Sequence, residues 1–403
     1  MDIKNDEITR VRGSKTNAFT NGKICTKVAT GMVEFVHGDK RLRTPMQRVG
    51  AKGEGKFEPI TWDQAYATIK ERFNTIIDVY GPQAILPLKY AGPMGMLSVG
   101  SMDERFFNHM GASQLNSLPL CTGASGAAWD SVLGDVGGIA HAEMAESKLI
   151  VIWANNITVG HLHLIKTIRE ARKAGAKVVV IDPKRIRIAD DADLFLQINP
   201  GTDVVLAYAV ANLIREAGGL DQAFLDQYVS GVDEFLAEAR NWSVEKAAQV
   251  CGIAADDIRL FANYWTTIKP AALSMGVAIE RSRNGGSATR ALIALPLLTG
   301  NFGPRGAGIC DTSSYFNIDR ASLKKSEWID PAIRTLNILD VCEHIVEEDI
   351  DPPIKGLFIY NHNPVAVHPR QNLLLQALAK EDLFTVGYDV AMTDSLRYAD
   401  IVL

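Results

Sequence analysis

The apolar residues of this chain fall into two alternating patterns, amphipathic stretches and short continuous apolar runs. Between Thr61 and Gly81, the apolar positions Ile69, Phe73 and Ile76 recur at spacings of three or four, which is typical of a helix with one buried face. Thr61 is a suitable N-cap and Gly81 a suitable stop, so the sequence predicts one helix between them.

Short apolar runs flank a second amphipathic stretch. Leu149–Trp153 and Lys177–Ile181 read as buried strands, and His161–Ala174 reads as a helix that Gly175 ends. Two strands joined by a helical crossover pair in parallel, because a tight turn cannot connect them. This segment is therefore predicted to form a strand–helix–strand unit.

The same alternation recurs along the chain. We expect further strands at 84–88, 194–198, 272–277, 356–360 and 383–388, and helices at 102–110, 203–217, 287–299 and 372–379. Ser243 and Asp256 are expected to cap short helices, and 92–100 and 301–325 are expected to form glycine-containing loops, the second long and functional. Alternation of this kind predicts an α/β fold with open parallel sheets and helices on both faces.

Polar residues follow four of the expected strands, at the edge where parallel sheets bind ligands. These clusters are Asn155-Asn156, Asp182-Pro183, Gly201-Thr202-Asp203 and Asn361 to Pro364. Taken singly, each is also consistent with an ordinary helix cap or turn. Because four of them stand at equivalent strand ends, we expect them to share a polar ligand.

Composition narrows the classes of function. The formal net charge is −5 with no long basic run, which argues against a nucleic-acid partner. No uninterrupted apolar run reaches the ~18 residues of a membrane span, and residues 1–13 lack the apolar centre of an export signal. The G-x-G-x-x-G fingerprint of nicotinamide dehydrogenases is missing as well.

Cysteine usage points to a reducing compartment. The five cysteines are odd in number and widely spaced, without a C-x-x-C pair: Cys25, Cys121, Cys251, Cys310 and Cys342. Neither a disulfide framework nor a self-contained zinc or iron–sulfur site is expected from this spacing. A cytoplasmic location follows, with the periplasm open if an export signal has been lost.

The sequence resembles a known family, the DMSO reductase superfamily of molybdopterin oxidoreductases, with formate dehydrogenases and periplasmic-type nitrate reductases as the most similar members. The resemblance runs across essentially the whole chain. Its motifs are Asn21–Lys27, Arg41–Met46, Ile60–Ala65, Trp153–Asn156, Ile181–Lys184, Pro200–Asp203, Leu298–Asn301 and Tyr398–Leu403.

The resemblance implies a molybdopterin guanine dinucleotide cofactor with molybdenum or tungsten. The positions implied to hold one guanine dinucleotide are Asn155, Asn156, Asp182, Gly201, Thr202 and Asp203. Asn363, Pro364 and Asp389 match the strand ends of a pseudo-symmetric partner domain, which serves the other dinucleotide.

Cys121 falls where the family places its protein ligand to the metal, and a soft thiolate suits molybdenum. Two alternatives stay open: Cys121 as a buried structural residue, and Ser125 as the ligand. Arg290 matches an arginine that faces the substrate carboxylate in formate dehydrogenases. Thr122 stands where those enzymes carry a histidine, which puts formate in doubt.

The resemblance also implies a domain organisation. Two Rossmann-like open parallel-sheet domains related by pseudo-symmetry are expected, beside a small partial N-terminal β-rich domain. The expected division is 1–58 for the N-terminal iron–sulfur-type domain, 59–140 with 293–403 for the first cofactor domain, and 141–292 for the second.

Both chain ends depart from the family pattern. Cys25 matches the fourth ligand of a [4Fe–4S] cluster whose first three cysteines are absent, so Cys25 is a remnant of that site and the cluster is expected only in the intact protein. Lys27 matches a lysine between cluster and pterin. Leu403 ends the sequence inside an apolar run with no terminating turn, and a frayed strand there would expose apolar edge surface. The chain is therefore predicted to be a fragment lacking both ends.

The function implied is that of a catalytic subunit, or a fragment of one, performing two-electron redox chemistry on a small-molecule substrate. An electron-transfer partner protein is expected, without nucleic acid and without membrane insertion. The alternative is a non-catalytic structural subunit of a respiratory complex with the same fold, which loss of the N-terminal cysteines also fits.

Overall fold

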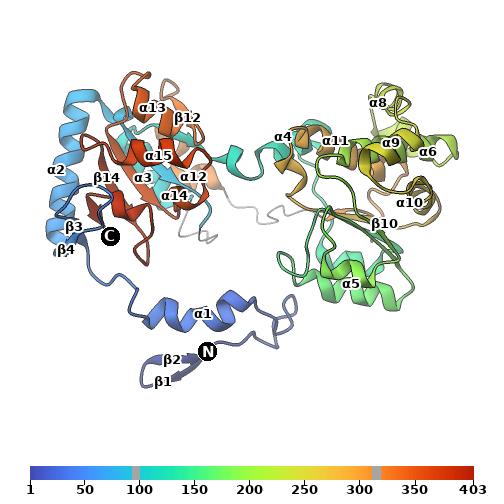
Figure 1. The fold of residues 1–403 in the computed structure, drawn as a ribbon, viewed down its shortest axis with the longest axis horizontal. Coiled ribbons are helices and arrows are strands. Elements are labelled where there is room, and N and C mark those ends of the chain that lie inside the picture. The colour runs from blue at the N-terminus through green and yellow to red at the C-terminus, as the bar shows by residue number, and fades with distance from the viewer. Residues whose placement is uncertain (93–99, 311–318) are drawn as a thin grey trace. The chain divides into compact units, whose positions relative to one another are not determined.

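The structure is a computed structural model that describes residues 1–92, 100–310 and 319–403 (Figure 1). Its contacts divide the chain into two compact units. The first unit comprises Met1–Gly13, Ile24–Cys121 and Phe316–Leu403, and the second comprises Ser14–Lys23 and Thr122–Tyr315. The three-part domain division expected from the sequence stays a prediction.

A six-stranded sheet forms the centre of the first unit, in the order β4-β3-β15-β14-β13-β5. The parallel strands are β5 (Ile85–Lys89), β13 (Gly356–Tyr360), β14 (Phe384–Tyr388) and β15 (Ile401–Val402). The strands β3 (Met46–Arg48) and β4 (Phe57–Pro59) extend the sheet antiparallel. The apolar run at the end of the sequence is paired, because β15 lies between β14 and β3 in the sheet, and Val402 is fully buried.

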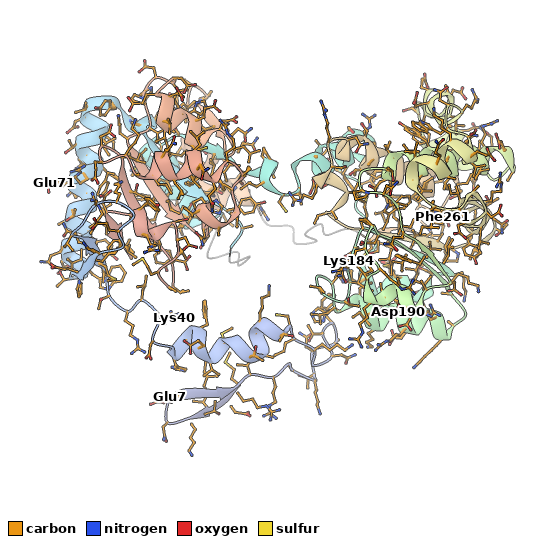
Figure 2. All side chains as sticks on the ribbon, viewed as in Figure 1. Glu7, Lys40, Glu71, Lys184, Asp190 and Phe261 are labelled. Atoms are coloured by element: carbon orange, nitrogen blue, oxygen red, sulfur yellow. The ribbon has the colours of Figure 1, made fainter. Side chains whose placement is uncertain are left out.

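Helices cover both faces of this sheet. On one face, Phe73 and Ile76 of α2 (Trp62–Tyr80) pack with Ile85 and Phe384. Figure 2 shows Glu71 on the opposite, solvent-facing side of the same helix. On the other face, the strands β5 and β13 pack against helices α13 (Val341–Glu347) and α15 (Gln371–Leu378).

The start of α2 confirms the sequence prediction. The Thr61 hydroxyl accepts a hydrogen bond from the Gln64 amide at 3.2 Å, and the Gln64 side chain accepts one from the Thr61 amide at 2.9 Å. This reciprocal pair satisfies two backbone donors that the first helical turn leaves free. The helix then ends at Tyr80, before Gly81 with φ of +84°.

Smaller elements complete the first unit. The N-terminal strands β1 (Asp2–Lys4) and β2 (Glu7–Arg10) form an antiparallel hairpin, followed by α1 (Thr26–His37). The remaining elements are η1 (Pro82–Ala84), α3 (Met102–Met110), η2 (Leu118–Leu120), α12 (Arg320–Lys324), η6 (Ser326–Trp328), α14 (Pro364–Val367), η7 (Leu396–Tyr398) and the parallel pair β6 (Gln114–Asn116) and β12 (Thr335–Asn337).

The second unit is built on a five-stranded, fully parallel sheet in the order β11-β10-β7-β8-β9. Its strands are β7 (Leu149–Trp153), β8 (Lys177–Ile181), β9 (Leu194–Leu196), β10 (Ala271–Met275) and β11 (Gly308–Cys310). The chain runs from β7 outward to β9 and then returns to place β10 on the other side of β7. The strand order therefore reverses between β7 and β10, which is where such sheets bind ligands.

Both faces of this sheet are buried, so its strands are almost continuously apolar. Val151 and Trp153 face one core, together with Phe261, which Figure 2 shows among the helices of this unit. Ile150 and Ile152 face the other core. The helices are α4 (Gly123–Leu133), α5 (Leu164–Lys173), α6 (Asp203–Glu216), α7 (Gln222–Tyr228), α8 (Val232–Ala239), α9 (Val244–Cys251), α10 (Ala255–Thr267) and α11 (Gly285–Leu298), with short η3 (His141–Glu146), η4 (Arg187–Asp191) and η5 (Ile279–Arg281).

Most expected elements are confirmed, and the differences have local causes. Ser243 caps α9 by accepting from the Lys246 amide at 3.2 Å. The cap expected at Asp256 is wrong, because α10 starts earlier and Asp256 lies inside its first turn. The expected loop 301–325 contains β11 and α12, and its residues 311–318 lie outside the described residues, as do residues 93–99 of the other loop.

Within the described residues, no helix is both long enough and apolar enough to cross a bilayer.

Candidate functional site

A close backbone contact defines the crevice where the strand order reverses. Ala154, directly after β7, has a φ of +53°, and the Gly276 amide, directly after β10, donates to the Trp153 carbonyl at 2.8 Å. A Cβ at Gly276 would lie 1.9 Å from the Ala154 carbonyl oxygen. Only glycine fits there, so the two strand ends stay close enough to present their backbones to one ligand.

Asn155 is fixed by a buried partner. Its Nδ2 donates to the Ser274 hydroxyl of β10 at 3.0 Å, and Ser274 is fully buried. Asn156 instead accepts from the Thr158 hydroxyl at 2.7 Å, within the turn that follows β7. The structure thus holds both predicted amides at the crevice, with Asn155 tied to the neighbouring strand.

Two carboxylates accompany these amides, Asp182 directly after β8 and Asp203 at the first position of α6. Asp203 accepts from the Trp153 indole N–H at 2.8 Å. Burial raises the pKa of Asp203, and the charge of Asp182 raises it further. Burial also raises the pKa of Asp182, which accepts from the Lys184 amide at 2.8 Å. Such carboxyl groups are suited to hold sugar hydroxyls or a base edge.

The turn before α6 also lies at this crevice. Gly201 has a φ of +79°, and its carbonyl accepts from the Asn284 side chain at 3.2 Å. The Thr202 hydroxyl donates to the Asn199 carbonyl at 2.7 Å. The structure therefore brings all six residues predicted for one dinucleotide to the carboxyl edge of a single sheet.

The first unit repeats the glycine contact on its own sheet. Asn361, directly after β13, has a φ of +53°, and its carbonyl accepts from the Gly92 amide at 3.0 Å. A Cβ at Gly92 would lie 2.5 Å from that carbonyl oxygen. The six-stranded and the five-stranded sheet therefore share one arrangement. In each, a residue with left-handed φ follows one strand and faces a glycine that follows the neighbouring strand.

The predicted residues of the first unit lie around this second contact. Asn363 accepts from the Ser395 hydroxyl at 2.6 Å, and Pro364 begins α14. Asp389 follows β14 and accepts from the Val390 amide at 2.6 Å, and burial raises its pKa. These three residues therefore share one edge of the six-stranded sheet.

A histidine pair at this edge escaped the sequence analysis. Nε2 of His362 and Nε2 of His368 lie 2.7 Å apart, so one ring donates and the other accepts. Burial lowers the pKa of His362 to about 3 and that of His368 to about 4. In the sequence, the two histidines are marked only by their positions on either side of Asn363-Pro364, and such spacing alone does not indicate that the rings are in contact.

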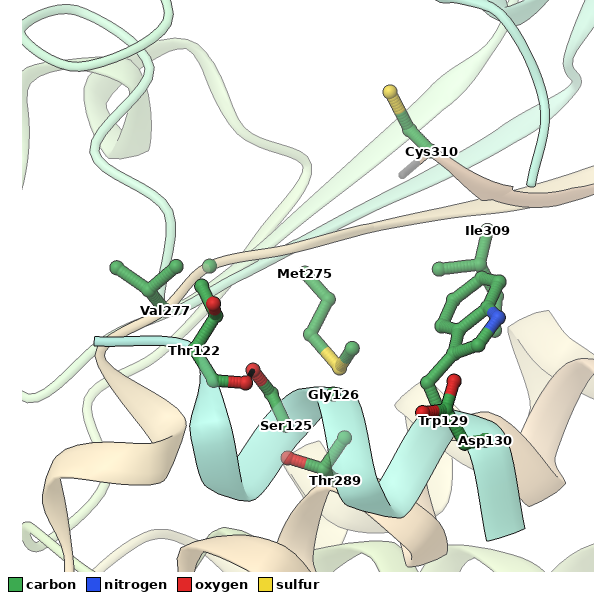
Figure 3. Close-up of a pocket in the computed structure, with 11 residues that line it drawn as sticks. Thr122, Ser125, Gly126, Trp129, Asp130, Met275, Val277, Thr289, Ile309 and Cys310 are labelled. Carbon is green, nitrogen blue, oxygen red and sulfur yellow. Dashed lines mark hydrogen bonds between the residues drawn. The ribbon is translucent and has the colours of Figure 1, made fainter. Parts of the chain in front are cut away.

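Helix α4 carries the segment with the predicted metal ligand. Cys121 is a free, partly exposed cysteine, and its amide donates to the Leu118 carbonyl at 3.0 Å. Thr122 follows directly and lines a pocket of about 260 Å³ in the second unit. Figure 3 shows Ser125 and Trp129 of α4 and Met275 of β10 around this pocket. Ser125, the alternative ligand, is thus a pocket-lining residue.

Arg290 lies elsewhere on α11. It lines an apolar groove of about 740 Å³ with Phe224, Tyr228 and Phe302. The α11 residue in the Thr122 pocket is Thr289, which is fully buried and donates to the Gly285 carbonyl at 2.9 Å. The structure therefore does not bring Arg290 into the pocket that Thr122 and Ser125 line, and its catalytic role stays a prediction.

The predicted iron–sulfur remnant lies at the start of α1. Cys25 is the N-cap residue of α1, and Lys27 is exposed in its first turn. Among residues 1–92, 100–310 and 319–403, no three His, Cys, Asp or Glu side chains lie close enough together to hold a metal ion. The roles of Cys25 and Lys27 stay predictions.

The two crevices suit a large polar ligand. In each, a glycine leaves room for backbone contact, and amide, hydroxyl and carboxyl groups surround the strand ends. The donors and acceptors fit a nucleotide better than a small apolar compound. A resident cofactor with nucleotide ends therefore fits the residues present.

Comparison with known proteins agrees with this fit. A family model described as molybdopterin oxidoreductase matches residues 41–403. The probable oxidoreductase YoaE of Bacillus subtilis is 36% identical over 99% of this chain. The dimethyl sulfoxide reductase DmsA of Haemophilus influenzae is 28% identical over the full chain, and formate dehydrogenase H of Escherichia coli is 28% identical over 79% of it.

The chain spans 58%, 56% and 45% of the lengths of these three relatives. Among solved structures, acetylene hydratase from Pelobacter acetylenicus matches 98% of this chain and 58% of its own, with a TM-score of 0.83 and 23% sequence identity, which shows a shared fold. Since the family model covers nearly the whole sequence, this chain belongs to the molybdopterin oxidoreductase family.

Proposed function

We propose that this chain is the catalytic part of a molybdopterin-dependent oxidoreductase that performs two-electron redox chemistry on a small substrate. The observation that carries the proposal is the pair of glycine-lined crevices, one on each parallel sheet. Each offers the backbone and polar groups that one guanine dinucleotide needs. Bound there, the cofactor with molybdenum or tungsten would supply the two-electron step.

In this scheme, the residues of the chain bind the cofactor and orient it. Asn155, Asp182 and Asp203 hold the base and sugar of one dinucleotide in the second unit, and Asn363 and Asp389 hold the other in the first. Burial raises the pKa of all three aspartates, and their carboxylate oxygens can accept hydrogen bonds from sugar hydroxyls or from the N–H groups of a base edge. Cys121 would supply a thiolate to the metal.

The substrate class is proposed as a small molecule that exchanges two electrons, such as a sulfoxide or formate. Dimethyl sulfoxide reductases and formate dehydrogenases are both among the relatives. Thr122 and Ser125 place hydroxyl groups in the pocket of about 260 Å³. Electrons would pass to a partner protein, and a cytoplasmic location is proposed with the periplasm as the alternative.

The test is the cofactor content of protein purified anaerobically from a host that makes molybdopterin guanine dinucleotide. We expect molybdenum or tungsten in near-stoichiometric amount, with GMP released on acid treatment. In Cys121→Ala we expect GMP to be retained, while the metal is lost or its electron paramagnetic resonance signal changes. Cys342→Ala, which removes a thiol buried in a hydrophobic core, is the matched control and should behave as the wild type.

The same assay on this chain extended to the length of its relatives decides the proposal. If that longer protein contains neither metal nor GMP, when YoaE made in the same host contains both, the proposal is contradicted. The structural-subunit alternative would then take its place. Retention of an unchanged metal signal in Cys121→Ala would reject Cys121 as the ligand and turn attention to Ser125.

A further inference from the structure

Helix α4 begins without a cap of its own. Thr122 occupies the N-cap position, but its side chain makes no capping hydrogen bond, and the first turn contains no acidic residue. The Ser125 amide instead donates at 2.8 Å to a carboxylate oxygen of Glu280, which is 155 residues further along the chain. A carboxylate at this position satisfies a free backbone donor and is favoured by the helix dipole.

The backbone around Glu280 fixes where its carboxylate lies. A Cβ at Gly285 would lie 2.4 Å from the Glu280 Cα, so α11 can start this close to η5 only with glycine there. Upstream, Gly276 is held against Ala154 at the end of β7. Glu280 therefore sits on a short segment anchored at both ends, between the crevice and α4.

The second oxygen of this carboxylate is unusual. Glu280 Oε1 is buried and has no hydrogen-bond partner among the residues that the structure describes. A buried carboxylate oxygen without a hydrogen-bond partner is destabilising. If Glu280 served only to stabilise the fold, both of its carboxylate oxygens would be expected to have partners. Within the described ranges, the hydrogen bond of the Glu280 side chain goes to the start of α4.

We propose that Glu280 is a positioning residue that fixes the start of α4 and thereby the segment Cys121-Thr122 that leads into it. The proposal rests on the function proposed above, in which Cys121 binds the metal. The carboxylate acts through the Ser125 amide, so it needs an acceptor oxygen at that place and no negative charge. Glu280→Gln retains such an oxygen, whereas Glu280→Ala does not.

Hydrogen exchange of α4 in the 403-residue chain tests the contact without any cofactor. In Glu280→Ala we expect the Ser125 amide to exchange about ten-fold faster, because it loses its hydrogen-bond acceptor. Glu280→Gln should stay close to the wild type. Glu170→Ala, which removes an exposed carboxylate from α5 in the same unit, is the control and should leave α4 unchanged.

Alkylation of Cys121, followed by peptide mass spectrometry, tests the consequence. We expect iodoacetamide to modify Cys121 several-fold faster in Glu280→Ala than in the wild type or in Glu280→Gln, with buried Cys251 as the internal reference. Equal rates in all three proteins would overturn the proposal. Glu280→Gln behaving like Glu280→Ala would also overturn it, since charge and not position would then matter.

Metal-loaded protein separates this inference from the function on which it rests. If the wild type takes up metal, its electron paramagnetic resonance signal should change in Glu280→Ala and not in Glu280→Gln. An unchanged signal in Glu280→Ala refutes the positioning role and leaves the proposed function intact. If the wild type takes up no metal, the proposed function fails, while exchange and alkylation still decide whether Glu280 fixes the helix.

Discussion

Gly276 and Gly92 make close backbone contacts at the two crevices. Each directly faces the carbonyl oxygen of a residue with φ of +53° after a neighbouring strand. A side chain at either position would have to push the two strand ends apart. These glycines therefore couple the stability of the sheet edge to the shape of the crevice.

Gly276→Ala is expected to lower the free energy of unfolding by about 1–3 kcal/mol, since the new Cβ would overlap the Ala154 carbonyl. Urea denaturation measures this change. Gly286→Ala is the control, because a Cβ there meets only the Ala124 carbonyl at 3.9 Å. A Gly276→Ala protein as stable as Gly286→Ala would mean that the strand ends separate freely.

The histidine pair is expected to make stability depend on acid. The pKa of His362 is lowered from 6.5 to about 3 and that of His368 to about 4, so the unfolded chain binds protons that the folded chain does not. The pair's contribution is therefore complete above pH 6.5 and is lost as the pH falls toward 4, by about 1.4 kcal/mol per pH unit for each such proton.

Urea midpoints measured between pH 7 and pH 4 check this dependence. Replacing both histidines with glutamine should reduce the slope in that range to what His141 and His161, whose pKa values are also lowered by burial, still contribute, whereas His109→Gln, at an exposed histidine of α3, should leave the slope unchanged. A wild-type curve that is already flat would contradict the buried, neutral state of the pair.

Among the elements, those with strong local signals were predictable and those set by distant contacts were not. The bounds of α2, α3, β7, β8 and β13 match the sequence prediction residue for residue, because caps and apolar runs of strand length define them. The start of α5 was placed too early, at His161, because the structure holds that ring 2.6 Å from His141, a contact that no periodicity reveals.

Part of the candidate site could likewise be predicted from the sequence, and part could not. The polar residues after each strand, such as Asn155 and Asp182, could be predicted from the rule that ligands lie at the carboxyl ends of parallel strands. Their partners could not. Ser274, which holds Asn155, and Glu280, which accepts from the Ser125 amide, come from segments more than 100 residues away, and neither stands in a recognisable motif.

Removing the capping box of α2 is expected to lower the stability of the protein by a measurable amount. Thr61→Ala should lower the free energy of unfolding by about 1 kcal/mol, because the Gln64 amide loses its acceptor. Thr75→Ala in the same helix removes a hydroxyl that bonds only the Glu71 carbonyl, and its effect should stay within about 0.5 kcal/mol. Equal losses in both proteins would show that the cap makes no special contribution.

At the scale of the whole molecule, each unit has its own sheet buried between its own helices. A core truncation is therefore expected to act within one unit. Leu273→Ala in β10 and Leu357→Ala in β13 each remove a fully buried side chain, at a cost of about 2–5 kcal/mol.

Hydrogen exchange at increasing urea, followed by peptide, separates the two units. Leu273→Ala should lower the midpoint of peptides from β7 and β10 only, and Leu357→Ala that of peptides from β13 and β14 only. If either substitution shifts both sets equally, the units unfold as one cooperative body.

The interleaved order of the two sheets also affects how the protein is made. The last strand of the five-stranded sheet ends at Cys310, whereas the six-stranded sheet must join β5 to β13, β14 and β15 from residues 356–402. On the ribosome the second unit is thus finished first. Strand β5 waits for β13, which is made more than 250 residues later, roughly ten seconds to a minute at about 5–20 residues per second. During that interval the apolar strand Ile85–Lys89 has no native neighbour in its sheet, which makes it a natural client segment for chaperones.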